Sequence, residues 1–142
     1  MEKSLVLVKP DAVERGLSGA VLARIEKEGL KLIALKMIQM SRALAERHYA
    51  VHNGKPFFPG LINYITSGPI VAAIFEGDDA INRIRNIMGK TDPAKAEPGT
   101  IRRDFGLDIE KNVIHGSDSA KTAAIEIALF FAGMETVSYQ RK

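Results

Sequence analysis

The segment that organises this 142-residue chain is Asn112-Val113-Ile114-His115-Gly116-Ser117-Asp118-Ser119. Its apolar residues before the histidine are typical of the end of a buried strand, which we expect over residues 112–114. The residues from Gly116 to Ser119 supply a turn and then a helix N-cap. We therefore expect His115 at the exit of a strand, where its side chain leaves the sheet and faces a cleft.

The helix expected after this segment, over Ala123–Ala132, is apolar except for Glu126. A carboxylate in so apolar a run must either face solvent or find a hydrogen-bonding partner. His115 is a candidate partner, and these residues alone leave both possibilities open.

The composition indicates one globular domain over residues 1–142. The hydrophobic fraction of 46% and the charged fraction of 26% are ordinary for a chain that buries a core. Cysteine is absent, which excludes disulfides and thiolate chemistry. The net charge of +3 is mild and dispersed, so it suits an anionic substrate and does not indicate nucleic acid as a partner.

The N-terminal apolar run, Leu5–Val8, is too short for the core of a signal peptide. No other run approaches the length that a membrane crossing requires. We therefore expect a cytoplasmic protein that does not bind a membrane.

Strands and helices alternate along the chain. Strands are expected at Leu5–Val8, Lys31–Met40, Ile70–Phe75 and Asn112–Ile114. Helices are expected around Val21–Ile25, from the Ser41 N-cap through Val51, over Phe57–Ile65 with a bend near Pro59-Gly60, after a Gly77-Asp78 cap, after Thr100, and after Ser119. This order predicts an α+β fold of the ferredoxin-like type, β-α-β-β-α-β. It contains a four-stranded antiparallel sheet covered by helices, an inserted helical hairpin, and a long loop before the last strand.

Two patterns that could indicate a binding site do not hold. Gly89-Lys90-Thr91 resembles the end of a Walker A loop, but the first glycine of that motif would fall at Ile84. His48 and His52 are four residues apart, which on a helix could hold a metal. With no third ligand nearby, and with Asn53-Gly54 ending the helix, we interpret them as a surface pair.

Cations and a hydroxyl lie at the ends of several expected elements. Lys9 follows the first strand, Arg85 lies on a helix, and Thr91 and Arg102 lie in or beside the long loop. If they converge, they could hold a polyphosphate, to which arginine gives paired hydrogen bonds. Together with His115 as a nucleophile or base, they favour a phosphate-handling enzyme.

Six segments, in the right order and spacing, resemble the signature of the nucleoside diphosphate kinase family. They are residues 112–119, Val8-Lys9-Pro10-Asp11-Ala12-Val13, His48-Tyr49, Pro56-Phe57-Phe58, Thr66-Ser67-Gly68-Pro69 and Gly99-Thr100-Ile101-Arg102. The resemblance extends from about Ser4 to Phe131. It implies transfer of the γ-phosphate of a nucleoside triphosphate, typically ATP, to a nucleoside diphosphate. It also implies a ping-pong mechanism through a phosphohistidine, with broad base specificity.

The same resemblance implies the roles of the catalytic residues. His115 is the expected nucleophile, and Glu126, assisted by Ser117, is expected to orient and polarise its ring. Lys9 is expected to reach the phosphates and the ribose hydroxyls, and Tyr49 to position the Lys9 end of the site.

It also implies how the nucleotide is held. Arg85, Thr91 and Arg102 are expected to bind the phosphates, Asn112 the ribose 3′-hydroxyl, and Phe57 the base by stacking. Stacking accepts any base, in keeping with broad specificity. Mg²⁺ is the expected cofactor, carried by the nucleotide phosphates without a ligand from a protein side chain.

Members of this family are homo-oligomers, and the loop around Pro93 and Pro98 is the contact that the resemblance implies. The tail stops at Gln140-Arg141-Lys142, so both a tetramer and a hexamer stay open. Lys90 and Arg103 are departures from many relatives, and we expect them to raise the positive potential near the phosphates.

Two alternative functions are compatible with these residues. One is a ferredoxin-like module that binds nucleotides or nucleic acid without turnover. The other is a histidine-dependent phosphatase, which would release the phosphate to water. Phosphate transfer from ATP distinguishes all three possibilities.

Overall fold

A computed structural model describes residues 1–142. Its elements are, in chain order, β1 (Glu2–Val8), α1 (Pro10–Glu14), α2 (Ser18–Lys27), β2 (Lys31–Ile38), α3 (Arg42–His48), η1 (Ala50–His52), α4 (Phe58–Ile65), β3 (Ile70–Gly77), α5 (Ala80–Met88), η2 (Pro93–Lys95), α6 (Ile101–Phe105), β4 (Ile114–Gly116), α7 (Ala120–Phe130) and η3 (Gly133–Glu135). None of the helices combines the length and the apolar character needed to cross a membrane.

The four strands form one sheet in the order β2-β3-β1-β4, and every neighbouring pair is antiparallel. This is the ferredoxin-like α+β arrangement that the sequence predicts. The α3–α4 hairpin is inserted between β2 and β3, also as predicted. The two central strands, β1 and β3, supply much of the core, since almost all their residues are buried.

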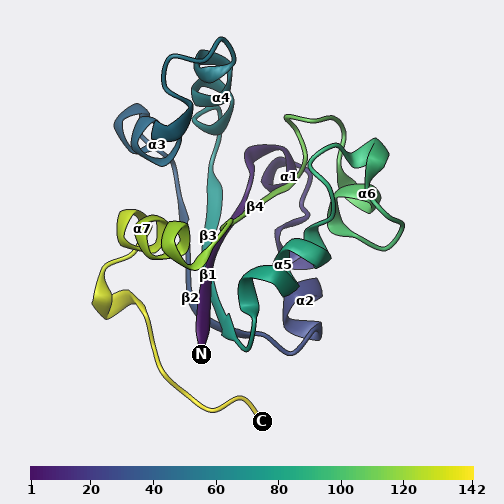
Figure 1. The fold of residues 1–142 in the computed structure, drawn as a ribbon, viewed down its shortest axis with the longest axis vertical. Helices are drawn as coiled ribbons and strands as arrows, with labels where there is room; N and C mark the ends of the chain where they lie inside the picture. The colour runs from purple at the N-terminus through teal and green to yellow at the C-terminus, as the bar shows by residue number, and fades with distance from the viewer.

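The two faces of the sheet are covered by different helices (Figure 1). Val6 and Val8 of β1 face a core that includes residues of α2 and α5. Leu5 and Leu7 face the opposite core, which includes residues of α3, α4 and α7. Successive side chains of a strand point to opposite faces of the sheet. A shift of one residue along a strand therefore moves a side chain from the α5 face to the α7 face.

The register of β4 against β1 determines which face of the sheet the His115 side chain points to. β4 consists of Ile114–Gly116, so the predicted strand over residues 112–114 is wrong by two residues. His115 pairs with Leu7 and lies within the strand, not at its exit. Because Ile114 belongs to the α5-side core, His115 points to the other face, toward α7 and α3. A strand of three residues is too short to show its limits by periodicity.

Two helix starts also differ from the prediction. α4 begins at Phe58 without a bend, because Pro59 lies in its first turn, where a missing backbone N–H costs no hydrogen bond. The N-cap of α5 is Asp79, not Gly77-Asp78, and its side chain makes no cap. The Glu2 carboxylate accepts the backbone N–H of Ile81 at 2.9 Å instead. A cap supplied by a residue so distant in sequence leaves no local signal.

Three smaller differences lie in the first half of the chain. The short helix α1 follows Lys9 directly, where only a strand exit was expected. The Ser41 cap is present, but α3 ends at His48 and the chain continues as a 3₁₀ turn. β2 ends at Ile38, two residues before the predicted Met40, and contains an irregularity in register between Leu32 and Ala34.

Candidate active site

The backbone of β4 fits closely against α5. A Cβ added to Gly116 would lie 2.6 Å from the Met88 sulfur, so only glycine fits there. This close packing on one face holds the strand that presents His115 on the other.

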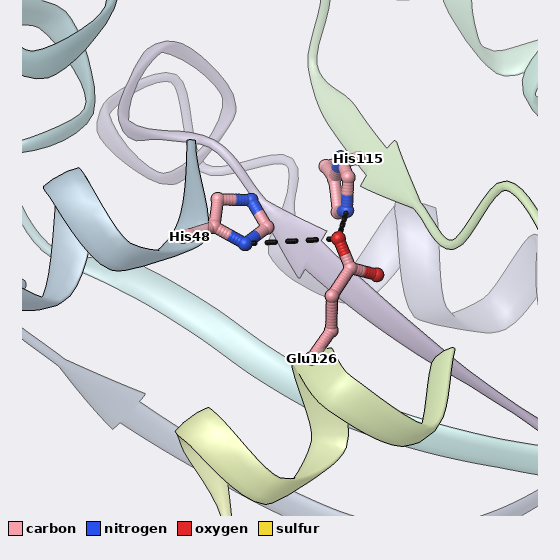
Figure 2. Close-up of side chains that lie close together, drawn as sticks. All are labelled: His48, His115 and Glu126. Atoms are coloured by element: carbon pink, nitrogen blue, oxygen red, sulfur yellow. Dashed lines mark hydrogen bonds and ion pairs between the residues drawn. The ribbon is translucent and has the colours of Figure 1, made fainter. Parts of the chain in front are cut away.

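His115 and Glu126 are hydrogen-bonded, which answers the question that the sequence left open. The Nε2 atom of His115 lies 2.9 Å from Oε2 of Glu126 (Figure 2). The second carboxylate oxygen, Oε1, accepts the hydroxyl of Ser117 at 2.7 Å. The Ser117 oxygen in turn accepts the backbone N–H of Leu5 in β1 at 3.1 Å. A chain of hydrogen bonds thus joins β1, β4 and α7.

The environment of Glu126 keeps its carboxylate ionised. Burial acts to raise its pKa, but the hydrogen bonds from His115 and Ser117 and the neighbouring imidazoles outweigh burial, so the pKa is lowered. No hydrogen bond within the protein involves Nδ1 of His115. The ring therefore has one nitrogen held by Glu126 and the other free.

A strained turn precedes the histidine. Val113 has φ of 80°, and the N–H of Ile114 donates to the carbonyl of Asn112 at 3.0 Å, which is the pattern of a γ-turn. A β-branched residue with this φ is unusual and costs about 1–3 kcal/mol. Burial of Val113 and a 2.8 Å hydrogen bond from the Lys9 N–H to its carbonyl hold the turn in place. Strain of this kind is typical of functional sites.

His115 lines a cavity of about 510 Å³ between the sheet, α7 and the η1 turn. The sequence-predicted residues that line it are Tyr49, Arg85, Thr91, Arg102, His115 and Glu126. Of the cations expected to converge beside the histidine, Arg85 and Arg102 line the same cavity, whereas Lys9 does not. A larger hollow of about 730 Å³ between α2 and α5 contains no histidine.

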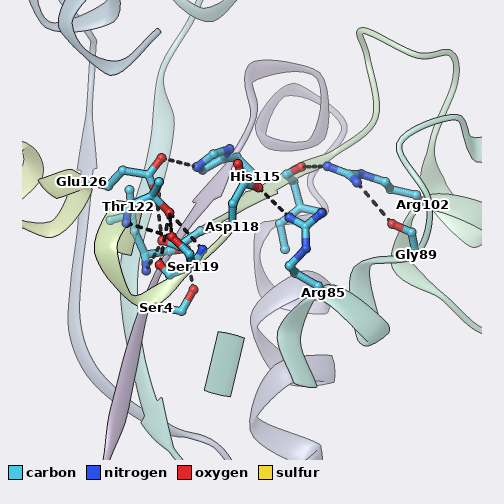
Figure 3. Close-up of polar contacts among 12 residues, drawn as sticks. Ser4, Arg85, Gly89, Arg102, His115, Asp118, Ser119, Thr122 and Glu126 are labelled. Carbon is cyan, nitrogen blue, oxygen red and sulfur yellow. Dashed lines mark hydrogen bonds and ion pairs between the residues drawn. The ribbon is translucent and has the colours of Figure 1, made fainter. Parts of the chain in front are cut away.

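The two arginines of the cavity are held differently (Figure 3). Arg85 is exposed and forms an ion pair with Asp118 at 2.8 Å. Arg102 is buried and donates to the carbonyl oxygens of Gly89, at 3.2 Å, and Ile114, at 2.7 Å. Burial, and secondarily the charge of Arg85, lowers the pKa of Arg102 to about 10, which leaves it charged at neutral pH.

Lys9 and Asn112 lie together outside the cavity lining. The Lys9 ammonium donates to the Asn112 side-chain oxygen at 2.7 Å. The Asn112 amide donates to the carbonyl of Thr91 at 3.0 Å and so connects Lys9 to the loop that contains Thr91. Burial, followed by the charge of Arg102, lowers the pKa of Lys9 to about 8.

Tyr49 and Phe57 lie on the hairpin side. The ring of Tyr49 packs against His48, with centroids 4.6 Å apart, and burial raises its pKa to about 12. No hydrogen bond joins Tyr49 to Lys9. Phe57 is 51% exposed and contacts His52, with ring centroids 5.2 Å apart. An exposed aromatic face of this kind is available to stack on a planar ligand.

His48 was wrongly interpreted as a surface residue. Its side chain is only 1% exposed, and its ring packs edge-on against His115, with centroids 4.7 Å apart (Figure 2). Nδ1 of His48 lies 3.7 Å from Oε2 of Glu126. Burial lowers its pKa to about 3, so the ring is neutral. Asp118, beside Arg85, was also missed, because its place after a glycine and a serine indicated only a turn.

The chain matches the family model described as nucleoside diphosphate kinase over residues 2–136. It is similar to a nucleoside diphosphate kinase of Dehalococcoides mccartyi, with 59% identity over the full length of both chains. The corresponding protein of Carboxydothermus hydrogenoformans is 56% identical over 99% of this chain and 95% of its own.

Solved structures give the same result. A nucleoside diphosphate kinase of Aquifex aeolicus superposes with a TM-score of 0.93 at 46% identity, covering 96% of this chain and 99% of its own. A halophilic one from Halobacterium salinarum, solved in complex with CDP, superposes with a TM-score of 0.96 at 47% identity, covering 99% and 93%.

Proposed function

Because the chain belongs to the nucleoside diphosphate kinase family, and so moves the γ-phosphate of a nucleoside triphosphate to a nucleoside diphosphate, we propose that His115 carries the phosphate between the two. The observation that supports this most is the hydrogen bond of Nε2 to Glu126, which leaves Nδ1 free on a ring that lines the cavity. A histidine fixed in one tautomer is prepared to act as a nucleophile.

In the first half-reaction, Nδ1 attacks the γ-phosphorus of the triphosphate. The N–P bond forms as the bond to the β-γ bridging oxygen breaks, and the nucleoside diphosphate leaves. The imidazole ring becomes positively charged as phosphorus binds, because Nε2 keeps its proton. The ionised Glu126 carboxylate, 2.9 Å away, stabilises that charge, and Ser117 holds the carboxylate in place.

In the second half-reaction, a terminal phosphate oxygen of the acceptor diphosphate attacks the phosphorus of phosphohistidine. The N–P bond breaks, and its electron pair returns to Nδ1. Donor and acceptor use the same cavity in turn, which predicts ping-pong kinetics.

The nucleotide is held by groups on both sides of His115. Arg85, Thr91 and Arg102 line the cavity and are suited to bind the phosphates. The Lys9 ammonium is suited to neutralise the charge of the phosphates. The Asn112 side-chain oxygen, which accepts from Lys9, has a second lone pair that can accept the ribose 3′-hydroxyl. Phe57 offers the base a stacking face.

The cavity residues fit Mg²⁺ that arrives with the nucleotide. The charged side chains that line the cavity are arginines and two carboxylates, and each carboxylate is already bonded, Glu126 to His115 and Ser117 and Asp118 to Arg85. A protein-held Mg²⁺ site needs free oxygen ligands. When bound to the phosphates, the ion reduces their negative charge. Arg85 and Arg102 supply positive charge to the same phosphates.

We propose that the protein is a homo-oligomer. Leu35 and Met37 are 52% and 60% exposed on β2, which is an edge strand of the sheet. Exposed apolar side chains on an unpaired edge favour contact with another chain. Light scattering would distinguish a tetramer from a hexamer. A cytoplasmic location stays a prediction from the sequence.

Incubation with γ-labelled ATP in the absence of an acceptor tests the proposal. The protein should take up an acid-labile, base-stable label, and added GDP or CDP should discharge it. Release of the label to water would indicate a phosphatase, and no uptake would indicate a binding protein. His115→Ala should take up no label, and labelling at the rate of the unmodified protein would overturn the assignment.

A further inference from the structure

We propose that His48, His115 and Glu126 form a binding site for a divalent transition-metal ion of the Zn²⁺ class, and that an ion there stops phosphate transfer. The site is distinct from the Mg²⁺ that the nucleotide carries. The three side chains come from α3, β4 and α7, and each offers one donor atom (Figure 2).

The donor atoms already lie close to the spacing that a metal needs. All three lie within 4.8 Å of one another. Tetrahedral Zn²⁺ with bonds of about 2.0–2.1 Å requires donors about 3.4 Å apart. The separation of the Glu126 oxygen from His115 Nε2 is 2.9 Å, and from His48 Nδ1 it is 3.7 Å. The two imidazole nitrogens lie within 4.8 Å of each other, so they would approach by up to about 1.4 Å to complete the set.

The state of His48 provides an independent indication of a ligand. Neither of its ring nitrogens has a hydrogen-bond partner, although the side chain is 1% exposed. A buried polar group without a partner is costly and uncommon in native structures. A metal ion bound to Nδ1 would satisfy one of these nitrogens.

The donor types select the kind of metal. Two imidazole nitrogens and one carboxylate oxygen suit Zn²⁺ and its neighbours, whereas Mg²⁺ prefers oxygen ligands alone. All three residues line the cavity, which leaves a fourth position for water or another small ligand. Arg85 and Arg102 also line it, and their charge opposes a dication. We therefore expect weaker binding than in closed structural zinc sites.

The expected inhibition follows from the tautomer of His115, and this step rests on the proposed function. A neutral imidazole that binds a metal through Nε2 carries its single proton on Nδ1. The proton of Nε2 therefore passes through water to Nδ1, and no net proton is released. Nδ1 then lacks the lone pair that would attack phosphorus, whereas the phosphate-binding arginines are unchanged.

Metal binding is tested on the metal-free full-length protein, without nucleotide. Calorimetry with Zn²⁺ should show one site per chain, and Co²⁺ in its place should give the intense visible absorption of tetrahedral coordination. A large excess of Mg²⁺ should displace neither. His48→Phe should weaken Zn²⁺ binding by about tenfold or more, since it removes one of three protein ligands. His52→Phe is the matched control and should bind Zn²⁺ normally.

Equal Zn²⁺ affinity of the unmodified protein and His48→Phe would contradict the proposed site. Absence of Zn²⁺ binding by the unmodified protein would contradict it as well. If His48→Phe does not fold, His48→Gln and Glu126→Gln replace it, and both should bind more weakly. The second measurement is label uptake from γ-labelled ATP with Mg²⁺ in excess. Zn²⁺ should suppress uptake in the unmodified protein, and a zinc-selective chelator should restore it.

The rate of His48→Phe, whatever its own value, should not change with Zn²⁺. If Zn²⁺ binds but uptake continues unchanged, the inhibition is wrong while the site stands. Labelling of His115→Ala would instead contradict the proposed function, so the two failures are distinguishable.

Discussion

His115, which lines the cavity, and Phe57, which lies on the hairpin outside the cavity lining, differ in how firmly the fold holds their side chains. The His115 ring is fixed by Glu126, which is fixed by Ser117, which is tied to Leu5 in the sheet. Phe57 is half exposed, and the rings and cations near it belong to its own hairpin. With the roles proposed for His115 and Phe57, the transferred phosphate would be held by the fold and the base would not, in keeping with the broad base specificity that we predict.

The largest effect on catalysis is expected from Glu126→Gln, which changes the side chain that holds the His115 ring. The variant keeps the size of the side chain but removes the charge that stabilises the imidazolium, so kcat should fall about 100-fold. The KM for nucleotides should change little, because both Glu126 oxygens are engaged with His115 and Ser117 and Glu126 is not among the residues proposed to bind the phosphates. Steady-state kinetics measure both. Glu46→Gln, an exposed acid on α3, is the control, and an unchanged kcat in Glu126→Gln would remove the basis of the comparison.

Arg102 and Arg85 should contribute differently to folding stability, although both are proposed to bind the phosphates. Arg102→Met should lose both nucleotide affinity and about 2 kcal/mol of folding stability, because it removes hydrogen bonds to two backbone carbonyls. Arg85→Met should lose affinity alone, with stability within about 0.5 kcal/mol of the unmodified protein, because its ion pair is exposed. Denaturant unfolding and nucleotide titration measure the two quantities. Equal stability loss in both variants would contradict the distinction.

The pH dependence of Lys9 has opposite signs for binding and for folding. Its pKa is about 8 in the folded protein and 10.5 when unperturbed, so the ammonium loses its charge above about pH 8. Nucleotide affinity should fall by up to about tenfold per pH unit above that value. Folding stability should rise between about pH 8 and 10.5, because the unfolded chain binds more protons there. Lys9→Met should abolish both slopes, and slopes that persist would exclude Lys9 as their source.

The smallest effect is expected from Phe57→Leu, which changes the half-exposed aromatic side chain on the hairpin. Loss of the stacking face should raise KM about tenfold for purine and pyrimidine nucleotides alike, with kcat nearly unchanged. Kinetics with ATP, GTP and CTP measure this. A change confined to one base would mean that Phe57 contributes to base specificity, and would contradict a base-independent stacking role.

The sequence predicted the fold well where patterns are local. The order of strands and helices, the caps at Ser41 and Ser119, the short helix after Thr100 and the inserted hairpin all follow from spacing and side-chain chemistry, and each is present. The exceptions depend on distant contacts. Glu2 caps α5 from the first strand, and β4 is too short to show a period.

The sequence indicated which residues belong to the candidate site, but not how their side chains contact one another. Resemblance indicated His115 and Glu126, but their hydrogen bond depends on which face of β4 points to α7, which no local pattern shows. His48 was misread for the same reason. Two histidines four residues apart indicate a surface pair, and only the packing of α3 on the sheet buries one of them against His115.

The position of the phosphate on the imidazole ring tests most directly whether Nδ1 of His115 is the nucleophile. The protein, phosphorylated by ATP without an acceptor and unfolded in base, can be examined by ³¹P NMR, which distinguishes the two isomers of phosphohistidine. Because Glu126 holds Nε2, the phosphate should be found on Nδ1 of His115. Phosphate on Nε2, or on another residue, would contradict the account.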